Sequence, residues 1–280
     1  MDFNSQEIIN IIERALKEDI CSGDLTAEAV IPDNPHSGGQ IIAKSDGILC
    51  GIDLVKAIFQ HFDERLEIVK NGSDGAKIKN GDVVLTLTGP SHGILACERV
   101  ALNFLGKLSG IATMTGKMVV ALGDEIINIL DTRKTTPGLR ILEKYAVICG
   151  GGKSHRNGLY DAILIKENHI AAAGGIEQAL ETCMKSIGDK RSTLLVEVEV
   201  RNLDELKKAL HFPVNRVMLD NFSLDGITEA ISIINGKIEI EISGGVTLET
   251  IRRYRGLAID YISSGAITHS APGIDFSLLI

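Results

Sequence analysis

The 280-residue sequence predicts an α/β protein whose second half builds a parallel sheet, either as an α/β barrel or as a doubly wound sheet. After residue 126, short apolar runs alternate with helical segments of about ten residues, which is the pattern of strands joined by crossover helices. Several of these runs are apolar almost without interruption, as expected for strands that are buried on both faces. A content of 44% hydrophobic residues is enough to bury a large core.

The N-terminal part has a different pattern. Residues 4–18 predict an amphipathic helix, because isoleucine and leucine recur at helical spacing behind a cap at Asn4 or Ser5. Residues 38–51 and 66–89 alternate between apolar and polar residues and contain Gly and Asn-Gly turns, which is typical of antiparallel strands and hairpins. A helix over about 54–62 lies between these two segments.

A longer helical pattern covers residues 94–122 and predicts a bridge between two domains. Ser109 and Gly110 predict a break in this helix. The second half then contains six predicted strands, at 126–130, 162–165, 194–200, 216–220, 237–242 and 261–265. Helices are predicted between them, at 176–187, 203–210, 224–234 and 248–256.

A polar residue or a glycine lies at or just after the carboxyl end of each predicted strand. These residues are Asp131, Lys166, Glu199, Asp220, the Ser243-Gly244-Gly245 run and Gly265. In a parallel barrel such ends converge on the face that holds the active site, and in an open sheet they border the binding crevice. Either architecture therefore brings these distant residues together.

The segment 131–166 is a local concentration of positive charge. It contains seven basic residues (Arg133, Lys134, Arg140, Lys144, Lys153, Arg156 and Lys166) and three acidic ones, a net charge of +4 in a chain of net charge −8. Such an island focuses the field on a small polyanion without making the whole surface basic. The overall acidity argues against a nucleic-acid partner.

Membrane and secretory classes are also disfavoured. No apolar run reaches the length of about 18 residues that a membrane span needs, and Asp2 and Glu7 replace the basic start of a signal or transit peptide. The five cysteines are odd in number and lack a CxxC motif. A reducing cytoplasm with buried thiols is therefore expected, and a zinc site is not.

The basic residues have ordinary alternatives to a binding role. Arg133 and Lys134 could be solvated surface residues, but their place after a strand favours an anion site, in which Arg binds carboxylate and Lys binds phosphate. The glycines at 150–152 could form only a flexible loop, yet beside His155 and Arg156 they allow backbone N–H groups to approach an anion. Lys166 abuts an apolar strand, so we expect it to be buried, with an anion or with Glu197 or Asp220 as its partner.

Glu199 and Asp220 are the candidate metal ligands. Carboxylates that face a cationic phosphate site favour capture of Mg²⁺, with water and substrate oxygens as further ligands. Alternatively, they balance the charges of Lys166 and Arg133. Glu197 shares a strand face with Glu199, because side chains alternate along a strand. His169 is expected to have a structural or supporting role.

Nine segments of the chain together resemble the quinolinate phosphoribosyltransferases, or carboxylating nicotinate-nucleotide pyrophosphorylases, of the type II phosphoribosyltransferase fold. The most specific are 131–140 (DTRKTTPGLR) and 150–170 (GGGKSHRNGLYDAILIKENHI). The others are 18–26 (EDICSGDLT), 47–51 (GILCG), 98–113 (ERVALNFLGKLSGIAT), 196–200 (VEVEV), 218–221 (MLDN), 243–247 (SGGVT) and 264–272 (SGAITHSAP). Cys21 and Ser22 depart from a glycine-containing form of this pattern, but lie outside the charged residues.

The resemblance implies an N-terminal α/β sandwich domain, residues 1–112, which the tail 270–280 joins. An incomplete parallel α/β barrel of about seven strands, residues 113–269, would follow. It also implies a homodimer or a higher assembly such as a hexamer, in which Arg99 enters the partner's site.

The resemblance further implies which residues bind the two substrates. Arg133, His155, Arg156 and Lys166 would hold the carboxylates of quinolinate. The phosphoribosyl pyrophosphate and its Mg²⁺ would be held by Lys134, Glu199, Asp220, Ser243, Gly244, Gly245, Gly265, Ala266 and Ile267. Lys134, Lys166, Glu199 and Asp220 would be the catalytic residues.

The implied reaction forms nicotinate mononucleotide, CO₂ and pyrophosphate on the route to NAD. No nucleophilic side chain is required, and His155, Lys166 or water could protonate C2 after CO₂ leaves. Two alternatives remain: a related enzyme with another acceptor, such as the ModD-like proteins, and a barrel that binds a polyanion without catalysis. Glu199 and Asp220 argue against the second, because carboxylates repel an anion unless a metal intervenes.

Overall fold

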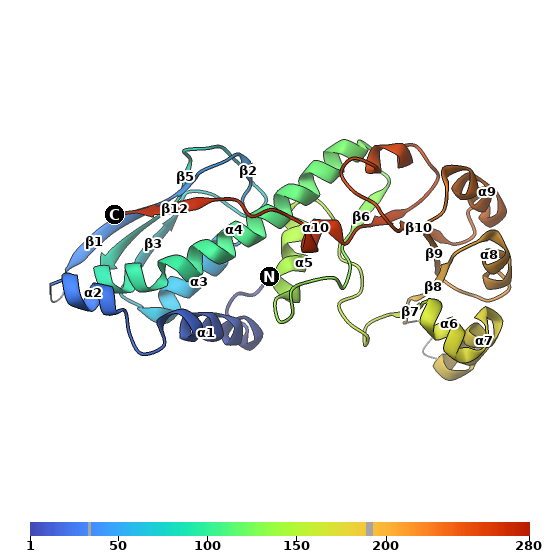
Figure 1. The fold of residues 1–280 in the computed structure, drawn as a ribbon, viewed down its shortest axis with the longest axis horizontal. Helices are drawn as coiled ribbons and strands as arrows, with labels where there is room; N and C mark the ends of the chain where they lie inside the picture. The colour runs from blue at the N-terminus through green and yellow to red at the C-terminus, as the bar shows by residue number, and fades with distance from the viewer. Residues whose placement is uncertain (33–34, 189–192) are drawn as a thin grey trace. The chain divides into compact units, whose positions relative to one another are not determined.

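The computed structural model describes the whole chain except residues 33–34 and 189–192 (Figure 1). The chain divides into two compact units. The first unit contains Met1–Gly116, Thr135–Gly151 and Ile267–Ile280, and the second contains Lys117–Lys134 and Gly152–Ala266. The loop and helix that follow Lys134 therefore belong to the first unit, although the basic residues on either side of them belong to the second.

The first unit is built on an antiparallel sheet, as its Gly-punctuated alternating runs predicted. Its four strands lie in the order β12-β1-β5-β3, so the C-terminal strand pairs with the first strand of the chain. Their bounds are β1 His36–Ala43, β3 Glu67–Lys70, β5 Val83–Pro90 and β12 Phe276–Leu279. A separate two-stranded ladder joins β2 (Gly47–Ile48) and β4 (Lys77–Ile78).

Six helices among the described residues belong wholly or partly to this unit. They are α1 Gln6–Ile20, α2 Leu25–Val30, α3 Ile52–Phe62, α4 Ser91–Leu122, α5 Arg140–Cys149 and α10 Ala266–His269. The predicted amphipathic helix is confirmed as α1, which begins after Ser5 and buries Ile8, Ile11, Ile12 and Leu16. The Ser5 side chain makes no capping hydrogen bond, whereas Asp24 caps α2 by accepting from the amides of Thr26 and Ala27.

The predicted break in the long helix is wrong, because α4 continues through Ser109 and Gly110. Ser109 is fully buried, and its Oγ accepts from the Cys50 amide and donates to the Cys50 carbonyl. A Cβ at position 110 would lie 2.2 Å from the Pro272 carbonyl oxygen. These small residues therefore let neighbouring backbone pack closely against α4, and they do not end it.

The second unit contains the parallel sheet that the strand–helix alternation predicted. Its described strands lie in the order β6-β11-β10-β9-β8-β7, and every neighbouring pair is parallel. About seven strands were expected; in the described residues six form, and a single parallel bridge from Leu130 to Lys153 extends the sheet beyond β6. The bounds are β6 Asn128–Leu130, β7 Ile163–Ile165, β8 Val196–Val200, β9 Arg216–Asp220, β10 Glu239–Ser243 and β11 Tyr261–Ser263.

Helices follow most of these strands, and α6 to α9 lie along one side of the sheet in Figure 1, as in a partial barrel. The predictions at 176–187, 203–210 and 224–234 are confirmed as α7, α8 and α9. The prediction at 248–256 is wrong, because only a 3₁₀ helix forms there, after a turn in which Thr250 Oγ1 accepts from the Thr247 amide. The bounds are α6 Glu167–Ala173, α7 Ile176–Ile187, α8 Leu203–Ala209, α9 Leu224–Ile234, η2 Ile251–Tyr254 and α10 Ala266–His269. No helix among the described residues is long and apolar enough to cross a membrane.

Candidate active site

The carboxyl ends of the parallel strands carry the residues that the sequence singled out. Asp131 follows β6, Lys166 follows β7, Glu199 lies near the end of β8, Asp220 ends β9 and Ser243 ends β10. Since all six strands run in one direction, these ends lie along one edge of the sheet. The predicted convergence of distant polar residues is therefore a property of the folded second unit.

Arg133 and Arg156 form the cationic part of this edge. Burial and the positive charge of Arg133 both lower the pKa of the Arg156 guanidinium. Arg156 Nη1 donates to the carbonyl of Ala162 at 3.3 Å, which orients the guanidinium. Lys134 is exposed beside Arg133, and its amide donates to Thr132 Oγ1 at 3.1 Å. Neighbouring like charges of this kind create a local potential that attracts an anion.

The prediction that Lys166 is buried is wrong, because its side chain is 43% exposed. The apolar strand β7 ends at Ile165, and Lys166 is the N-cap residue of α6, where the chain turns away from the sheet. Its ammonium group forms an ion pair with Glu199, as in the charge-balancing alternative for that glutamate, and the expected partners Glu197 and Asp220 are wrong. His169 has a supporting role, since its Nδ1 accepts from the Lys166 amide at 3.0 Å.

Protein groups lie against both ring nitrogens of His155. Its Nδ1 accepts from the Arg156 amide at 2.7 Å, and its Nε2 lies 3.1 Å from Glu197 Oε2 and 3.3 Å from Glu241 Oε2. Its own amide donates to Asp131 Oδ1 at 2.9 Å. Burial opposes a charge on the ring, but the hydrogen bonds and charges of the two carboxylates outweigh it and raise the pKa of His155 to about 9.

Arg216 completes a charged layer on the same face of the sheet. The strand register places it opposite Glu197 of β8 and Glu239 of β10. Its guanidinium binds Glu239 at 2.8 and 3.0 Å, lies 3.4 Å from Glu241 and covers the ring of Tyr261 at 3.9 Å. Sequence reasoning did not select Arg216 or Glu241. The available signal was the alternation of glutamate with isoleucine in a strand predicted to be buried.

The loops after β9 and β10 lie next to this edge, and the second of them contains two glycines. Asn221 Nδ2 donates to Asp220 Oδ2 at 2.8 Å, and the Asn221 amide donates to the Ser243 carbonyl at 3.0 Å. Gly244 has a φ of +93°, and a Cβ there would lie 2.3 Å from Asn221 Oδ1. Gly245 has a φ of +59°, with no atom within 4 Å of its added Cβ. Only glycine therefore fits the first position without strain, and the second leaves its backbone accessible.

The segment after β11 continues this edge. Ser264 Oγ donates to the Val246 carbonyl at 2.7 Å and accepts from the Ala266 amide at 3.3 Å, which fixes the backbone around Gly265. Ile267 is fully buried and belongs to the first unit. Arg99 also belongs to the first unit, as an exposed residue of α4.

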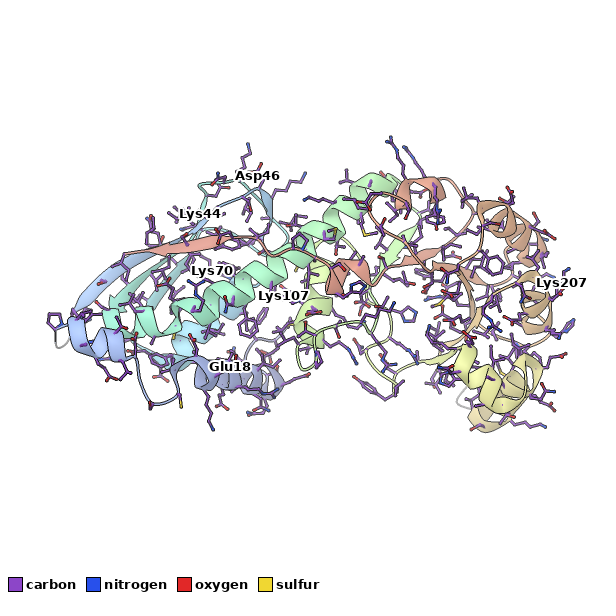
Figure 2. All side chains as sticks on the ribbon, in the orientation of Figure 1. Glu18, Lys44, Asp46, Lys70, Lys107 and Lys207 are labelled. Atoms are coloured by element: carbon purple, nitrogen blue, oxygen red, sulfur yellow. The ribbon has the colours of Figure 1, made fainter. Side chains whose placement is uncertain are left out.

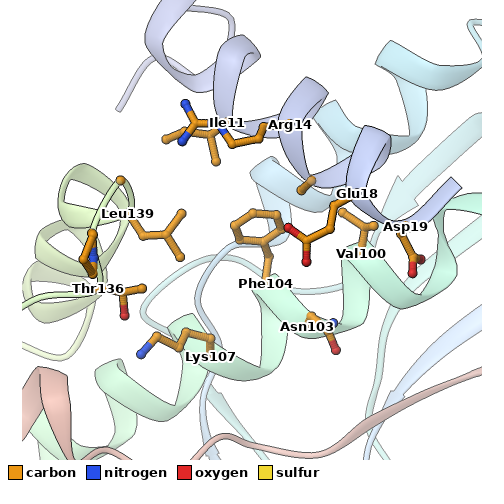
Figure 3. A pocket seen from close by; sticks show the side chains of 13 residues that line it. Ile11, Arg14, Glu18, Asp19, Val100, Asn103, Phe104, Lys107, Thr136 and Leu139 are labelled. Carbon is orange, nitrogen blue, oxygen red and sulfur yellow. The ribbon is translucent and has the colours of Figure 1, made fainter. Parts of the chain in front are cut away.

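The first unit contains two other features that could suggest a binding site, a cavity and a group of possible metal ligands. A cavity of about 490 Å³ between α1, α4 and residues 136–139 is lined by charges of both signs, Arg14 and Lys107 with Glu18 and Asp19 (Figure 3). The cavity therefore lacks the net positive charge that a polyanion needs. Charges of both signs also project from other parts of the first unit, for example Lys44 and Asp46 (Figure 2).

The second feature is the group of Cys50, Asp74 and Cys149, whose ligand atoms lie within 4.8 Å of one another. Asp74 already accepts hydrogen bonds from the amides of Gly51 and Ile52 and from the Tyr145 hydroxyl. Its carboxylate is therefore satisfied as the cap of α3. All five cysteines are free thiols. The expectation of buried thiols is confirmed for Cys50 and Cys97, but it is wrong for Cys21, which is exposed, and for Cys149 and Cys183, which are half-buried.

Comparisons with known proteins agree in pointing to one family. The family profile described as "Quinolinate phosphoribosyl transferase, C-terminal domain" matches residues 111–279, and the corresponding N-terminal domain profile matches residues 24–109. The probable nicotinate-nucleotide pyrophosphorylase [carboxylating] of Bacillus subtilis is 41% identical over 98% of this chain and 94% of its own. Quinolinate phosphoribosyltransferase [decarboxylating] 1b of Nicotiana tabacum is 40% identical over 98% of this chain and 82% of its own.

A solved structure gives the same result for the fold. The crystal structure of NadC from Streptococcus pyogenes superimposes with a TM-score of 0.95 at 43% sequence identity. The match covers 100% of this chain and 98% of that one. Both units are therefore similar to those of a single known protein.

Proposed function

The chain belongs to the quinolinate phosphoribosyltransferase family, and we propose that it transfers the phosphoribosyl group of phosphoribosyl pyrophosphate to quinolinate with loss of CO₂. The products are nicotinate mononucleotide, CO₂ and pyrophosphate, and the reaction belongs to NAD biosynthesis. The single observation that supports it best is the edge of the parallel sheet, where the Arg133 and Arg156 cations lie in the same unit as the Glu199 and Asp220 carboxylates.

Quinolinate would bind through its two carboxylates. Arg133 and Arg156 present neighbouring guanidinium groups, which suit bidentate binding of carboxylate, and a bound dianion would relieve their mutual repulsion. Lys166 is accessible at the end of β7, and its ion pair with Glu199 can be exchanged for a substrate carboxylate. His155 belongs to the same segment as Arg156, and because both of its ring nitrogens face protein groups, it would act on quinolinate through Arg156.

Phosphoribosyl pyrophosphate would bind along the neighbouring strand ends. Lys134 is an exposed cation for the phosphates. The loop of Ser243, Gly244 and Gly245 offers backbone N–H groups, and the positive φ angles of its two glycines support close approach of an anion. The segment of Gly265, Ala266 and Ile267 would complete this part of the site, with the Ala266 amide bound to Ser264 Oγ.

Glu199 and Asp220 suit Mg²⁺ in their chemistry. Both are carboxylates at the ends of adjacent parallel strands, and hard oxygen ligands together with substrate phosphates are what Mg²⁺ prefers. Mg²⁺ would neutralise negative charge on the departing pyrophosphate. The ion pair of Glu199 with Lys166 couples this ligand to the quinolinate side of the site.

The rest of the reaction depends on positioning. As pyrophosphate leaves, C1 of the ribose becomes oxocarbenium-like, and the pyridine nitrogen bonds to it, so the two substrates must lie next to each other. The nitrogen then becomes cationic and stabilises the carbanion left when the adjacent 2-carboxylate departs as CO₂. A proton must reach C2. Lys166 is the accessible donor near the site, whereas both ring nitrogens of His155 face protein groups.

We also propose that the enzyme is a cytoplasmic homodimer or a higher assembly built from such dimers, with Arg99 supplied to the site of the partner subunit. The exposure of Arg99 on α4 leaves it available for such a contact. The odd number of cysteines without a CxxC motif supports a reducing compartment.

The direct test is to incubate the purified protein with phosphoribosyl pyrophosphate, Mg²⁺ and one acceptor at a time, and to measure pyrophosphate. Quinolinate should support release, nicotinate and other pyridine carboxylates should not, and chelation of Mg²⁺ should stop the reaction. Release with a different acceptor only would identify a ModD-like enzyme. Binding of both substrates without release would identify a non-catalytic binder.

A further inference from the structure

We propose that Glu241, together with Glu197, is a positioning residue that fixes the His155 imidazole and, through it, the Arg156 segment that binds quinolinate. The proposal rests on the proposed function of the site. It assigns a role to a buried layer that lies beneath the substrate-binding edge and does not itself touch substrate.

The two carboxylates are fully buried and aim at one atom. Glu197 and Glu241 have no solvent exposure, and their Oε2 atoms lie 3.1 and 3.3 Å from His155 Nε2. Nε2 faces both carboxylates, and Nδ1 faces the Arg156 amide. The ring is therefore fixed in orientation.

The same contacts also fix the position of the Arg156 backbone. The amide of Arg156 is itself the donor to the ring, so a displaced imidazole would release the backbone that carries this guanidinium. On the other side, the His155 amide binds Asp131, and the Lys153 amide binds the Ile129 carbonyl at 2.8 Å. The segment from Lys153 to Arg156 is therefore attached to β6 through backbone bonds and to β8 and β10 through the His155 ring.

A metal ion does not explain this cluster as well. The ligand atoms of His155, Glu197 and Glu241 lie within 4.8 Å of one another, close enough to hold a cation. However, Arg216 Nη1 lies 3.4 Å from Glu241 Oε2 and 3.9 Å from Glu197 Oε2, so a permanent positive charge is already present. A buried ion pair contributes little stability beyond apolar packing. Its benefit here is a fixed direction for the imidazole.

The structure offers a matched pair of variants for the test. Glu241→Gln removes the carboxylate charge beside His155, whereas Glu239→Gln removes the same charge from the same strand and the same Arg216 partner without touching His155. We expect Glu241→Gln to raise KM for quinolinate about tenfold, the size typical of losing an outer-shell partner, with little change in KM for phosphoribosyl pyrophosphate. Glu239→Gln should leave both constants within about twofold.

A double-mutant cycle separates positioning from a general loss of stability. In a His155→Asn background, Glu241→Gln should have no further effect on KM for quinolinate, because the group through which it acts is gone. Equal effects of Glu241→Gln and Glu239→Gln, or full persistence of the Glu241→Gln effect without His155, would overturn the proposal.

NMR of the ¹⁵N-labelled imidazoles tests the same contact without turnover. Wild-type protein and Glu239→Gln should show a slowly exchanging His155 Nε2–H, identified by its loss in His155→Asn, and Glu241→Gln should broaden or lose it. If Glu241→Gln does not fold, the same test can be made with Glu197→Gln, because Glu197 on β8 contacts the same ring nitrogen. A wild-type protein without a protected Nε2–H contradicts the positioning role. A protected signal in a protein that does not turn over quinolinate contradicts the proposed function alone.

Discussion

Charged side chains at this site contact opposite charges that come from other strands. Lys166 after β7 pairs with Glu199 of β8, and His155 faces Glu197 of β8 and Glu241 of β10. The exception is the neighbouring pair of Arg133 and Arg156, since burial and then the like charge of Arg133 lower the pKa of Arg156. The side chains of Lys166 and His155 therefore face carboxylates, whereas the site is positive at Arg133 and Arg156, where quinolinate is proposed to bind.

Arg156→Ala tests the positive layer. We expect KM for quinolinate to rise about 10- to 100-fold, because a hydrogen bond between charged groups contributes about 1.5–3 kcal/mol. The melting temperature should change little, since the guanidinium is held in the protein by a 3.3 Å hydrogen bond to the Ala162 carbonyl. Arg252→Ala, on the exposed side of η2, is the control for loss of an arginine. Steady-state kinetics with unchanged quinolinate constants would remove Arg156 from the site.

The sequence predicted which charged residues matter but not all of their partners. The cationic segment and the strand-end carboxylates follow from local pattern, because strand direction alone brings them to one edge. The environment of Lys166 could not be predicted, since it depends on where α6 begins. The role of Glu241 depends on its contact with His155, which comes from a distant segment and which no local pattern specifies.

At the scale of helices and strands, glycine and serine have two different uses. Gly244 makes a left-handed loop possible, as expected for glycine after a strand. Ser109 and Gly110 instead lie inside a continuous helix and allow other backbone to approach it. A sequence pattern shows only that these residues are small, so it predicted a break where tertiary packing keeps the helix intact. The short helices α6 and α10 were missed because they are single turns or little more.

Gly110→Ala tests the packing of α4. Alanine favours a helix interior by about 1 kcal/mol over glycine, but its Cβ would lie 2.2 Å from the Pro272 carbonyl oxygen. We expect a net destabilisation of about 1–3 kcal/mol in denaturant unfolding, because backbone cannot move aside as a side chain can. Gly116→Ala is the matched control on the same helix, since its Cβ would meet the flexible end of Ile48. Equal stability of the two variants would contradict this packing.

At the scale of the whole molecule, similarity to the family extends through both units, and the residues proposed for one site are divided between them. Arg133, Arg156 and Lys166 belong to the second unit, whereas Arg99 belongs to the first. The proposed homodimer would supply Arg99 of one subunit to the second unit of the other. The fold class and the six strands followed from the strand–helix alternation, but the single bridge from Leu130 to Lys153 did not, because it depends on how the sheet ends.

Mixed dimers test this sharing. Arg99→Ala and Lys166→Ala should each abolish activity, and subunit exchange between them should restore about a quarter of wild-type activity, since half of the dimers are mixed and each mixed dimer has one intact site. Mixing Arg156→Ala with Lys166→Ala is the control, because both residues belong to the same second unit and no site becomes complete. Absence of recovery despite demonstrated exchange would count against a shared site.

The most direct measurement is the fate of the 2-carboxylate of quinolinate. With quinolinate labelled with ¹³C in that group, phosphoribosyl pyrophosphate and Mg²⁺, the protein should release one labelled CO₂ for each pyrophosphate and each nicotinate mononucleotide formed, and none when phosphoribosyl pyrophosphate is left out. Pyrophosphate release that leaves the label in the nucleotide, or no reaction with correctly folded protein, would contradict a site that holds the two anions together for transfer and decarboxylation.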